Sequence, residues 1–546
     1  MKDCKAADSR RDCSSHVPMV QHEQDSVLQD TSRVAGRQAL RNNVAAAVAL
    51  ADAVRSTLGP KGLDKMLLGD DGSTLVTNDG VTVLETAKVL HPTAKMLIST
   101  SRAQDDEVRD GTTSTVILTA ELLVNALELV DRGVHPAIIA SGYRMCLPVI
   151  EELLEEISRK STDNDSLSAV KTSLAGKGDQ GMQLVLAELA HNAAISEGTG
   201  MPEHTRIITH RTGSISNSKL VSGIVLAKSR VHREMSMKPE SGRIVVLDGG
   251  LEKRKPEIDA TLKITDLGAI KAFQERENIA LQKEVDCLVS AKINCLIVRD
   301  GIEDDAHIML ADAGILAYRR VERQDIEDIC RATGALPIFD LGHINNEDVG
   351  LFSCIREEKL NDVEHVIIEG AMESGNTVVL RGSTDLRLEE AKRAFDDALG
   401  VACQLIREPY ILPGGGASQI ALARQLRRFA ETIPGREQMA IEAFAGALEA
   451  IPRILAANAG MDPIDELLRV TAAQADLGSA WQGLDINSGV ITDMNEVSVT
   501  EPLSVTKHGI SGATEAAISV LRIDDVLWAK QDAQEPDWRE EGDRDD

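Results

Sequence analysis

The sequence predicts a multidomain protein that combines helical domains with an α/β domain. At 546 residues the chain is too long for one hydrophobic core, and its length suggests about three or four domains. Alanine-rich stretches with helical spacing of apolar residues lie around residues 36–157 and 436–473. Between them, short apolar runs alternate with helical stretches, which is the spacing of a βαβαβ unit. The predicted order is therefore helical, then mixed α/β, then helical.

The first helical part contains a strong helix followed by a hairpin. Residues 43–55 are rich in alanine, and Gly59 and Pro60 stop this helix. Residues 66–77 contain two short apolar runs around a glycine- and aspartate-rich turn, which predicts a β-hairpin. A second turn at residues 78–80 ends the hairpin.

The middle part predicts a small parallel sheet. Residues 295–298, 315–318 and 336–339 are short apolar runs typical of buried strands. Helical stretches at 305–313 and 325–333 separate them. Because parallel strands need crossover connections, this alternation favours helices packed on a parallel sheet.

The charge balance is strongly acidic. Acidic residues outnumber basic ones 87 to 59, so the formal net charge is -28. This charge argues against nucleic acid and against anionic membranes as main partners, because both require clustered lysine and arginine. Arginine also outnumbers lysine, and an acidic, lysine-poor surface suits a cytosol of very high salt. A halophilic source is therefore predicted, and an acidic protein from an ordinary cytosol is the alternative.

The hydrophobic residues and cysteines indicate a folded protein of a reducing compartment. Hydrophobic residues make up 43% of the chain but aromatic ones only 2%, so the cores must be aliphatic. Residues 1–29 contain no apolar stretch of signal-peptide length, and the sequence has no run of about 18 apolar residues. We therefore expect a cytoplasmic protein that does not span a membrane.

The cysteines indicate a reducing compartment. No CxxC pair occurs, and we expect free thiols at Cys4, Cys13, Cys146, Cys287, Cys295, Cys330, Cys354 and Cys403.

The strongest functional signal is a polar turn directly before an apolar helix. Asp110, Gly111, Thr112 and Thr113 precede the apolar residues 115–123. The first turn of a helix presents unpaired N–H groups and a partial positive charge, which favours binding of an anion. Gly111 permits a close approach of the backbone, the threonines add hydroxyl donors, and Asp110 is an oxygen ligand suited to Mg²⁺. The alternative is a structural helix cap formed by Asp110.

Three further turns have the composition of phosphate-binding loops. Residues 58–62 form a Gly-Pro-Lys-Gly loop, Asp79 lies in a turn, and residues 413–417 form a glycine run before a helix. Each has a structural alternative: a helix stop, local turn hydrogen bonds and a flexible hinge, respectively. We find no Walker A motif, GxGxxG fingerprint, kinase motif set or HExxH pair. The residues alone therefore indicate a multidomain protein with loops suited to a magnesium nucleotide.

Taken together and in this order, the motifs resemble those of group II chaperonin subunits, the archaeal thermosome and its eukaryotic cytosolic relative. The resemblance covers about residues 32–529. It rests on residues 57–62, 77–82, 104–113, 172–178, 313–321, 332–335, 413–417, 455–460 and 513–526.

The resemblance implies a chaperonin fold with a helical equatorial domain, a small intermediate domain and an α/β apical domain that carries a helical lid protrusion. The implied divisions are a disordered N-terminal extension (1–31), equatorial (32–159), intermediate (160–221), apical (222–373) with the protrusion at about 265–284, intermediate (374–412), equatorial (413–529) and a disordered acidic tail (530–546).

The resemblance also implies a role for individual residues. Asp397 matches the residue that orients the attacking water, Asp79 a second carboxylate that assists, and Asp110 the magnesium ligand. Lys177 matches a lysine that senses the γ-phosphate. The other residues implied to bind the nucleotide are Leu58, Gly59, Pro60, Gly62, Gly111, Thr112, Thr113, Gly415 and Glu501.

The implied function is that of an ATP-dependent chaperone subunit. Such subunits form a double ring of identical or mixed subunits, with eight or nine in each ring, that encloses unfolded polypeptides. A built-in lid replaces a separate co-chaperonin, the implied cofactors are ATP and Mg²⁺, and K⁺ is a further candidate.

This chain departs from the family pattern at several positions, which suggests a diverged haloarchaeal paralogue. Arg109 stands where the family has glycine, directly beside Asp110, and Gln419 stands where it favours glutamate. Arg109 favours an alternative function, a structural or regulatory subunit of a mixed ring with impaired hydrolysis. An unrelated nucleotide-dependent transferase is a third, more distant reading.

Overall fold

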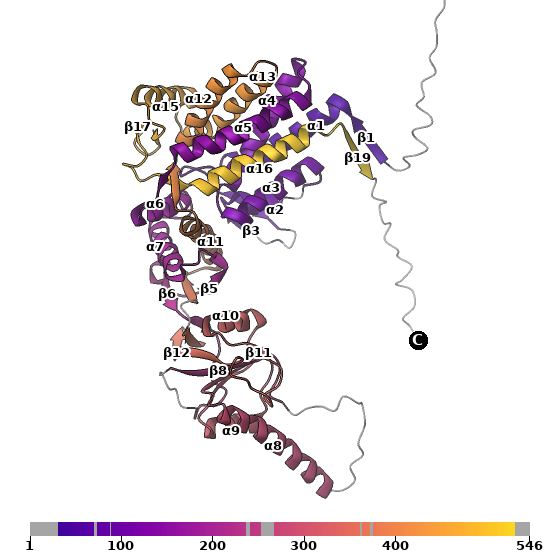
Figure 1. Cartoon of the computed structure of the whole chain (residues 1–546), viewed down its shortest axis with the longest axis vertical. Helices are drawn as coiled ribbons and strands as arrows, with labels where there is room; N and C mark the ends of the chain where they lie inside the picture. The colour runs from indigo at the N-terminus through magenta and orange to yellow at the C-terminus, as the bar shows by residue number, and fades with distance from the viewer. Residues whose placement is uncertain are drawn as a thin grey trace, which may run out of the picture.

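The protein folds into three tiers along its longest axis. The computed structural model describes residues 31–529 except 70–71, 73, 88, 236–240, 253–266, 361–362 and 372–374. Figure 1 shows a helical tier at the top, a small mixed tier in the middle and an α/β tier at the bottom. This arrangement confirms the predicted combination of helical and α/β parts. The exact domain boundaries stay a prediction.

The top tier is assembled from both ends of the chain and is almost entirely helical (Figure 1). Its helices are α1 (Gly36–Arg55), α2 (Gly80–Thr86), α3 (Pro92–Val108), α4 (Thr112–Asp131), α5 (Pro136–Ile157), α12 (Ala417–Thr432), α13 (Glu437–Leu448), α14 (Ala450–Asn458), α15 (Pro463–Leu477) and α16 (Leu503–Leu521).

The helical spacing of apolar residues explains why α1 forms and which face it buries. Leu40, Val44, Ala47, Ala51 and Val54 recur every three or four residues, and each is at most 4% exposed. They pack into the large aliphatic core of the top tier. The predicted helix at 43–55 is therefore confirmed, with a start seven residues earlier.

Helix α4 crosses the centre of the top tier. Val116, Ile117, Leu122 and Leu123 are at most 1% exposed. Among the described residues, α4 alone is long and apolar enough to cross a membrane by length and composition, and 61% of that window is buried. A helix that is apolar on most sides and buried in this way is typical of a protein core.

Short strands complete the top tier. The predicted hairpin is confirmed as β2 (Lys65–Leu68) and β3 (Thr74–Thr77). Strand β1 (Thr31–Ala35) pairs with β19 (Asp525–Ala529), so the two ends of the described chain lie side by side. Figure 1 shows this pair projecting from the body of the tier. A further hairpin joins β16 (Gln482–Asp485) to β17 (Val490–Asp493).

The middle tier packs three helices against a small sheet. Strand β14 (Asn376–Arg381) pairs in parallel with β5 (Thr205–His210) and antiparallel with β6 (Lys219–Ser222). The helices are α6 (Asp163–Ser173), α7 (Gln180–Glu197) and α11 (Asp385–Arg407), with the short 3-10 helix η1 (Pro202–His204). Where the top and middle tiers meet, β15 (Tyr410–Pro413) pairs with β4 (Arg159–Lys160) and β18 (Thr500–Pro502).

The bottom tier contains the predicted βαβαβ unit. Strands β8 (Gly242–Leu247), β9 (Cys295–Val298) and β10 (Leu316–Tyr318) pair in parallel, and β11 (Pro337–Ile338) pairs in parallel with β8. Helices α9 (Asp304–Asp312) and α10 (Arg323–Thr333) make the crossovers. The predicted elements are confirmed to within one or two residues at each end.

The sheet is larger than predicted and only partly parallel. Strands β12 (Gly350–Leu360), β13 (Val363–Gly370) and β7 (Ile224–Leu226) extend it in antiparallel pairing. The sequence did not predict β12, because its charged run of Arg356, Glu357, Glu358 and Lys359 lacks the apolar pattern of a buried strand.

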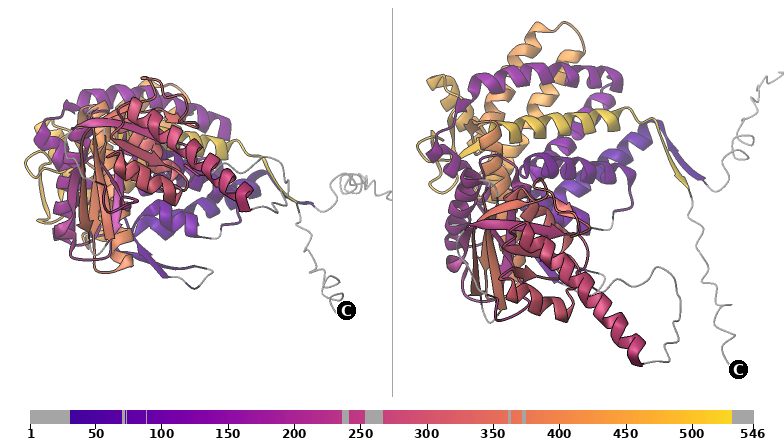
Figure 2. Two further views of the ribbon diagram at one scale, coloured as in Figure 1. Left: turned by 90° about the horizontal axis from the view of Figure 1, so that it is seen from below. Right: turned by 60° about the horizontal axis from the view of Figure 1, so that its bottom comes forward.

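Helix α8 and the predicted terminal segments remain to be placed. Helix α8 (Leu267–Ser290) extends outward from the bottom tier (Figure 2), over much of the predicted protrusion at 265–284. Residues 265–266 lie outside the described residues. So do the predicted acidic tail (530–546) and the N-terminal extension except for Thr31, which begins β1.

Cysteines in the described part of the chain are free thiols, as predicted: Cys146, Cys287, Cys295, Cys330, Cys354 and Cys403. Cys4 and Cys13 lie outside the described residues.

Candidate functional site

A cavity of about 480 Å³ lies between the top and middle tiers, within the size range of small-molecule sites. Its walls come from the loop after α1, the start of α2, the α3–α4 turn, the segment after α6, helix α11 and the loops around α12, β16 and β18. It brings together almost all of the predicted site residues: Leu58, Gly59, Pro60, Asp79, Asp110, Gly111, Thr112, Thr113, Lys177, Asp397, Gly415 and Glu501. Gly62 does not line it.

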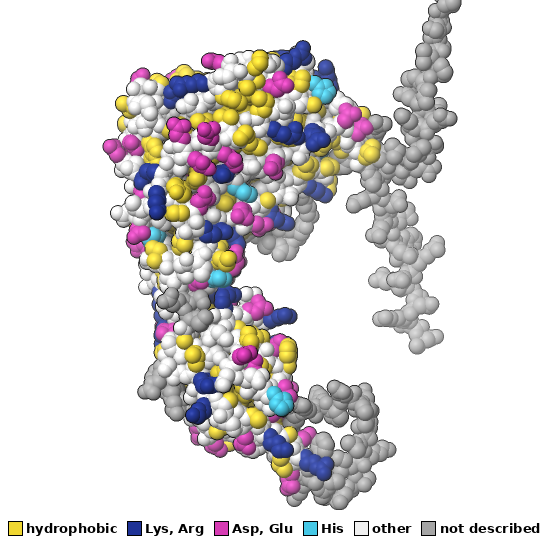
Figure 3. Space-filling view, in the orientation of Figure 1, with side chains coloured by type: hydrophobic (Ala, Val, Ile, Leu, Met, Phe, Trp, Pro, Cys, Tyr) yellow, Lys and Arg dark blue, Asp and Glu magenta, His cyan; other side chains and the backbone are white. Residues whose placement is uncertain are grey.

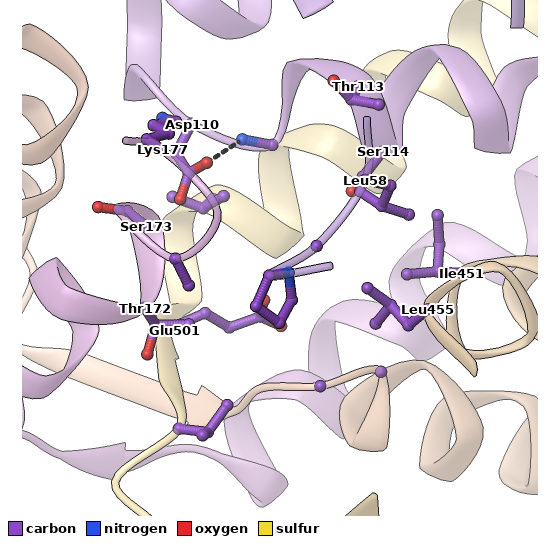
Figure 4. Close-up of a pocket in the computed structure, with 18 of the residues that line it drawn as sticks. Leu58, Asp110, Thr113, Ser114, Thr172, Ser173, Lys177, Ile451, Leu455 and Glu501 are labelled. Carbon is purple, nitrogen blue, oxygen red and sulfur yellow. Dashed lines mark hydrogen bonds between the residues drawn. The ribbon is translucent and has the colours of Figure 1, made fainter. Parts of the chain in front are cut away.

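The start of α4 forms one wall of this cavity. Gly111 is the residue before the helix, with a left-handed φ of 75°, and no side chain caps the first turn. Asp110 Oδ1 instead accepts a hydrogen bond of 2.7 Å from the Gly111 N–H (Figure 4). The alternative that Asp110 caps α4 is therefore wrong. The first-turn amides of α4 face the cavity without a side-chain acceptor, as an anion site requires.

The carboxyl group of Asp110 lies in a half-buried position in the cavity wall. Burial raises its pKa, whereas Lys177 and the Gly111 N–H lower it and Asp79 raises it further. A buried carboxylate is costly unless a cation or hydrogen bonds compensate it. Asp110 is therefore placed where a bound cation would be stabilised.

Lys177 and Asp397, both from the middle tier, form an ion pair in the cavity wall. Lys177 Nζ lies 2.5 Å from Asp397 Oδ2, and both side chains are less than a fifth exposed. Burial raises the pKa of Asp397 to about 7, and Asp79 adds to this rise although Lys177 opposes it. Burial alone would lower the pKa of Lys177, but Asp397, Asp110 and Asp79 raise it, so the amine stays charged.

Asp79 has a structural role as well as a place in the cavity wall. Its side chain caps α2 by accepting hydrogen bonds from the N–H groups of Val81 and Thr82. The predicted alternative of local turn hydrogen bonds is thus confirmed. The same carboxylate still acts on its neighbours, since it raises the pKa values of Asp110 and Asp397.

The loop after α1 depends on its two glycines. Gly59 has a φ of +83°, and a Cβ there would lie 2.3 Å from Leu455 Cδ2. A Cβ on Gly62 would lie 2.2 Å from the backbone oxygen of Thr57. Gly62 therefore permits the tight closure of the loop rather than lining the cavity.

Side chains from distant elements hold this loop in place. Asn458, at the end of α14, donates hydrogen bonds to the backbone oxygens of Arg55 (3.2 Å) and Leu58 (2.9 Å). Gly176 approaches so closely that a Cβ there would lie 2.8 Å from Gly59 O. The loop is thus fixed by contacts with both the top and middle tiers.

The opposite side of the cavity is apolar. Figure 4 shows Leu58, Ile451 and Leu455 gathered on the side away from Asp110 and Lys177. Glu501 lies at the floor, where burial raises its pKa to about 7 although Thr506 donates a hydrogen bond of 2.9 Å to it. One molecule with a polar and an apolar end would match this division.

The sequence reasoning missed several residues of the site. Ile451 and Leu455 supply the apolar wall, and Thr172 and Ser173 add hydroxyl groups at the end of α6. Gln104 is 1% exposed, and its Nε2 donates to the Asp110 carbonyl oxygen at 2.8 Å. Apolar residues of an ordinary helix carry no signal of a ligand, but the polar Gln104 on a buried helix face could have been noticed.

The donor set fits magnesium bound together with phosphates. In the described part of the chain, no group of three or more histidine, cysteine, aspartate or glutamate side chains is arranged to bind a metal ion. Mg²⁺ is commonly held by one or two carboxylates, water and substrate phosphates, rather than by a protein cage. Asp110 supplies such a carboxylate beside the α4 amides. Three half-buried carboxylates, Asp79, Asp110 and Asp397, act on the amine of Lys177 and raise its pKa.

Comparisons with known proteins agree on one family. The TCP-1/cpn60 chaperonin family model matches residues 50–531. Thermosome subunit beta of Archaeoglobus fulgidus is 43% identical over 511 residues, which are 92% of this chain and 94% of that protein. Thermosome subunit 1 of Haloferax volcanii is 41% identical over 508 residues, covering 92% and 90%. Thermosome subunit beta of Methanothermobacter thermautotrophicus is 40% identical over 516 residues, covering 94% and 96%.

Proposed function

The chain belongs to the TCP-1/cpn60 chaperonin family as a group II chaperonin subunit, and we propose that it binds ATP with Mg²⁺ in this cavity and hydrolyses it. The observation that carries the proposal is the meeting of two sets of groups. Asp110 and the uncapped amides of α4 come from the top tier, whereas Lys177 and Asp397 come from the middle tier. Phosphoryl transfer needs a metal ligand, fixed donors and a positioned water, and this cavity has candidates for each.

The division of the cavity suggests how the nucleotide lies. The phosphates would lie at the start of α4, where Gly111, Thr112 and Thr113 provide amides and hydroxyls. The loop at Leu58, Gly59 and Pro60, shaped by Gly62, would cover their other side. The adenosine would lie toward the apolar wall, Gly415 and Glu501.

The reaction relies on positioned groups and no covalent intermediate. Asp110 would hold Mg²⁺, which supplies neutralisation of the phosphate charge. Asp397 accepts a hydrogen bond from the attacking water and orients it, with Asp79 as the assisting carboxylate. Lys177 stays protonated, because Asp397, Asp110 and Asp79 outweigh burial, and so it can donate to the terminal phosphate. K⁺ is a further candidate cation for the negative side of the cavity.

The position of Asp397 suggests how hydrolysis is coupled to motion. Asp397 lies on α11 of the middle tier, so its approach to the phosphates depends on how this tier sits against the top tier. In the proposed cycle, closure of the middle tier carries the bottom tier and α8, the predicted lid protrusion, toward the closed state. The protein would act without a separate co-chaperonin.

Membership of the chaperonin family supports a wider function. The subunit assembles into a double ring of eight or nine identical or mixed subunits per ring, and this ring encloses unfolded polypeptides. The free thiols of the described cysteines fit a cytoplasmic location. The acidic charge of -28 fits a haloarchaeal source.

Steady-state phosphate release tests the proposal. The purified full-length protein is assayed at high salt with K⁺ and Mg²⁺, beside Asp397→Asn. We expect this variant to lower kcat by about 10²- to 10⁴-fold, because the water loses its oriented acceptor, with little change in nucleotide affinity. Asp396→Asn is the matched control: Asp396 is the preceding residue of α11, it does not line the cavity, and its variant should stay within about threefold of wild type.

Two results would reject the enzyme assignment. One is that the wild-type protein hydrolyses ATP no faster than Asp397→Asn. The other is that Asp397→Asn and Asp396→Asn lower kcat equally. Nucleotide binding without hydrolysis would instead favour the alternative, a structural or regulatory ring subunit.

A further inference from the structure

Arg109 occupies a backbone conformation that favours glycine. It ends α3 in the left-handed region, with φ 57° and ψ 13°, directly before Asp110. L-residues rarely adopt this conformation because of steric strain at Cβ. A long charged side chain at this position therefore needs a compensating role in the surrounding structure.

The aliphatic part of Arg109 packs directly on the backbone of α11. A Cβ built on Gly400 would lie 2.2 Å from Arg109 Cβ and 2.4 Å from Arg109 Cγ. Such a contact excludes any larger residue at 400 while Arg109 is present. Gly400 follows Asp397 by three residues, so this contact lies about one helical turn from the proposed catalytic carboxylate.

One face of α11 carries all of these contacts. Asp397, Gly400 and Gln404 are spaced by three and four residues, which places them on the same side of the helix. Gln404 Nε2 donates a hydrogen bond to the backbone oxygen of Glu107 in the last turn of α3. This face therefore runs from the cavity along the end of α3.

The guanidinium group of Arg109 extends beyond the main cavity. Its Nη2 lies 3.8 Å from Glu203 Oε1 of η1, in a second cavity of about 130 Å³. Glu203 and Gly400 line this second cavity and not the larger one. The charge of Arg109 also opposes the rise in pKa that burial causes in Asp105 and Asp396. The guanidinium thus lies among carboxylates of the junction between the tiers, although its Nε is buried without a hydrogen-bond partner among the described residues.

We propose that Arg109 is a positioning residue that clamps α11 onto the turn before Asp110, so that Asp397 is held in the cavity before nucleotide binds. This inference rests on the proposed function and assigns a regulation to the same site. The aliphatic part of Arg109 fixes α11 at Gly400, and its guanidinium faces Glu203 of η1, the short helix between α7 and β5. In this chain, the placement of Asp397 in the cavity therefore depends partly on Arg109 and not on the nucleotide alone.

Hydrogen exchange of α11 in the nucleotide-free, full-length protein tests the clamp. In Arg109→Gly we expect amides of 396–407 to exchange at least about tenfold faster than in wild type, and the difference to vanish when Mg-ATP is bound. The apparent KM for ATP should rise by about tenfold while kcat stays within about threefold, because only preorganisation is lost. Lys292→Gly is the matched control: Lys292 also has a left-handed φ, 55°, but it lies in the bottom tier between α8 and β9. It should leave α11 exchange unchanged.

A second pair of variants tests the contact itself. Gly400→Ala should force α11 away from Arg109 and lower kcat by about tenfold, and adding Arg109→Gly should recover most of this loss because the methyl group then has room. The clamp is overturned if Arg109→Gly leaves nucleotide-free exchange of α11 unchanged, or if Gly400→Ala is equally harmful with and without Arg109. Absence of hydrolysis in the wild type would instead contradict the proposed function alone, since the exchange measurement needs no turnover.

Discussion

The carboxyl groups of the cavity are only partly compensated for their removal from water. Asp110, Asp397 and Glu501 are half-buried carboxyls, and desolvation raises the pKa of each. Such groups make the free protein less stable, and a bound cation or donor can recover that loss. The carboxyl groups that lower the stability of the free protein are also the groups that would bind the magnesium of a nucleotide.

The pH dependence of stability should reveal Glu501. Its pKa rises from 4.5 to about 7 on folding, so the folded state binds more protons than the unfolded state in this range, and stability is lost as pH rises. Glu501→Gln should therefore stabilise the nucleotide-free protein at pH 8 by about 1–3 kcal/mol, with a smaller gain at pH 5.5. Thermal unfolding midpoints at both pH values measure this difference.

The control for this experiment is an exposed glutamate of the same tier. Glu431→Gln, at the end of α12, should unfold like wild type at both pH values. An equal gain from Glu501→Gln at both pH values would mean that the substitution improves packing and that the carboxyl does not titrate as inferred.

At the scale of elements, the site depends on the loop after α1, which is fixed by residues at or near the ends of two helices. The loop after α1 receives two hydrogen bonds from Asn458 of α14 and a close backbone approach from Gly176. These contacts fix the loop that would cover the phosphates.

Removing the Asn458 side chain should loosen this loop. Asn458→Ala removes the side-chain donor to the carbonyls of Arg55 and Leu58, at a cost of about 1–3 kcal/mol in stability. We expect the affinity for a fluorescent ATP analogue to fall by about tenfold, because the loop must then be ordered on binding. Asn42→Ala, an exposed asparagine of α1, is the control and should change neither quantity. Unaltered affinity in Asn458→Ala would show that the loop does not bind the nucleotide.

The sequence predicted local elements and the polar half of the cavity. The α4 start could be identified because a Gly-Thr-Thr turn before an apolar helix is a local pattern. Ile451 and Leu455 could not, since an apolar residue that lines a cavity looks like one that fills a core. Strand β12 was not predicted because its charged sequence lacks a strand pattern. Its neighbours β8 and β13 provide the hydrogen-bonded pairing that makes it a strand.

At the scale of the whole molecule, charge is the dominant feature. The chain carries a net charge of -28, and Figure 3 shows acidic side chains spread over all three tiers of the visible face. Like charges spread in this way repel one another and favour expansion. Salt screens this repulsion, and the screening length falls from about 10 Å at 0.1 M to about 3 Å at 1 M.

We therefore expect the protein to be stabilised by salt. Raising KCl from 0.2 to 2 M should raise the thermal unfolding midpoint by about 5 °C or more. Sucrose, which stabilises compact states without screening charge, serves as the control and should give a smaller rise. A midpoint independent of KCl, or an equal effect of sucrose, would argue for the alternative of an acidic protein adapted to ordinary salt.

The central claim is that the cavity between the top and middle tiers binds Mg-ATP for hydrolysis. The most direct measurement is an electron cryo-microscopy map of the full-length assembly with Mg²⁺, ADP and aluminium fluoride. The account predicts a ring in which the phosphate mimic lies at the start of α4, the metal contacts Asp110, and Asp397 lies next to the attacking position. An empty cavity at saturating nucleotide, or nucleotide bound elsewhere in the subunit, would contradict it.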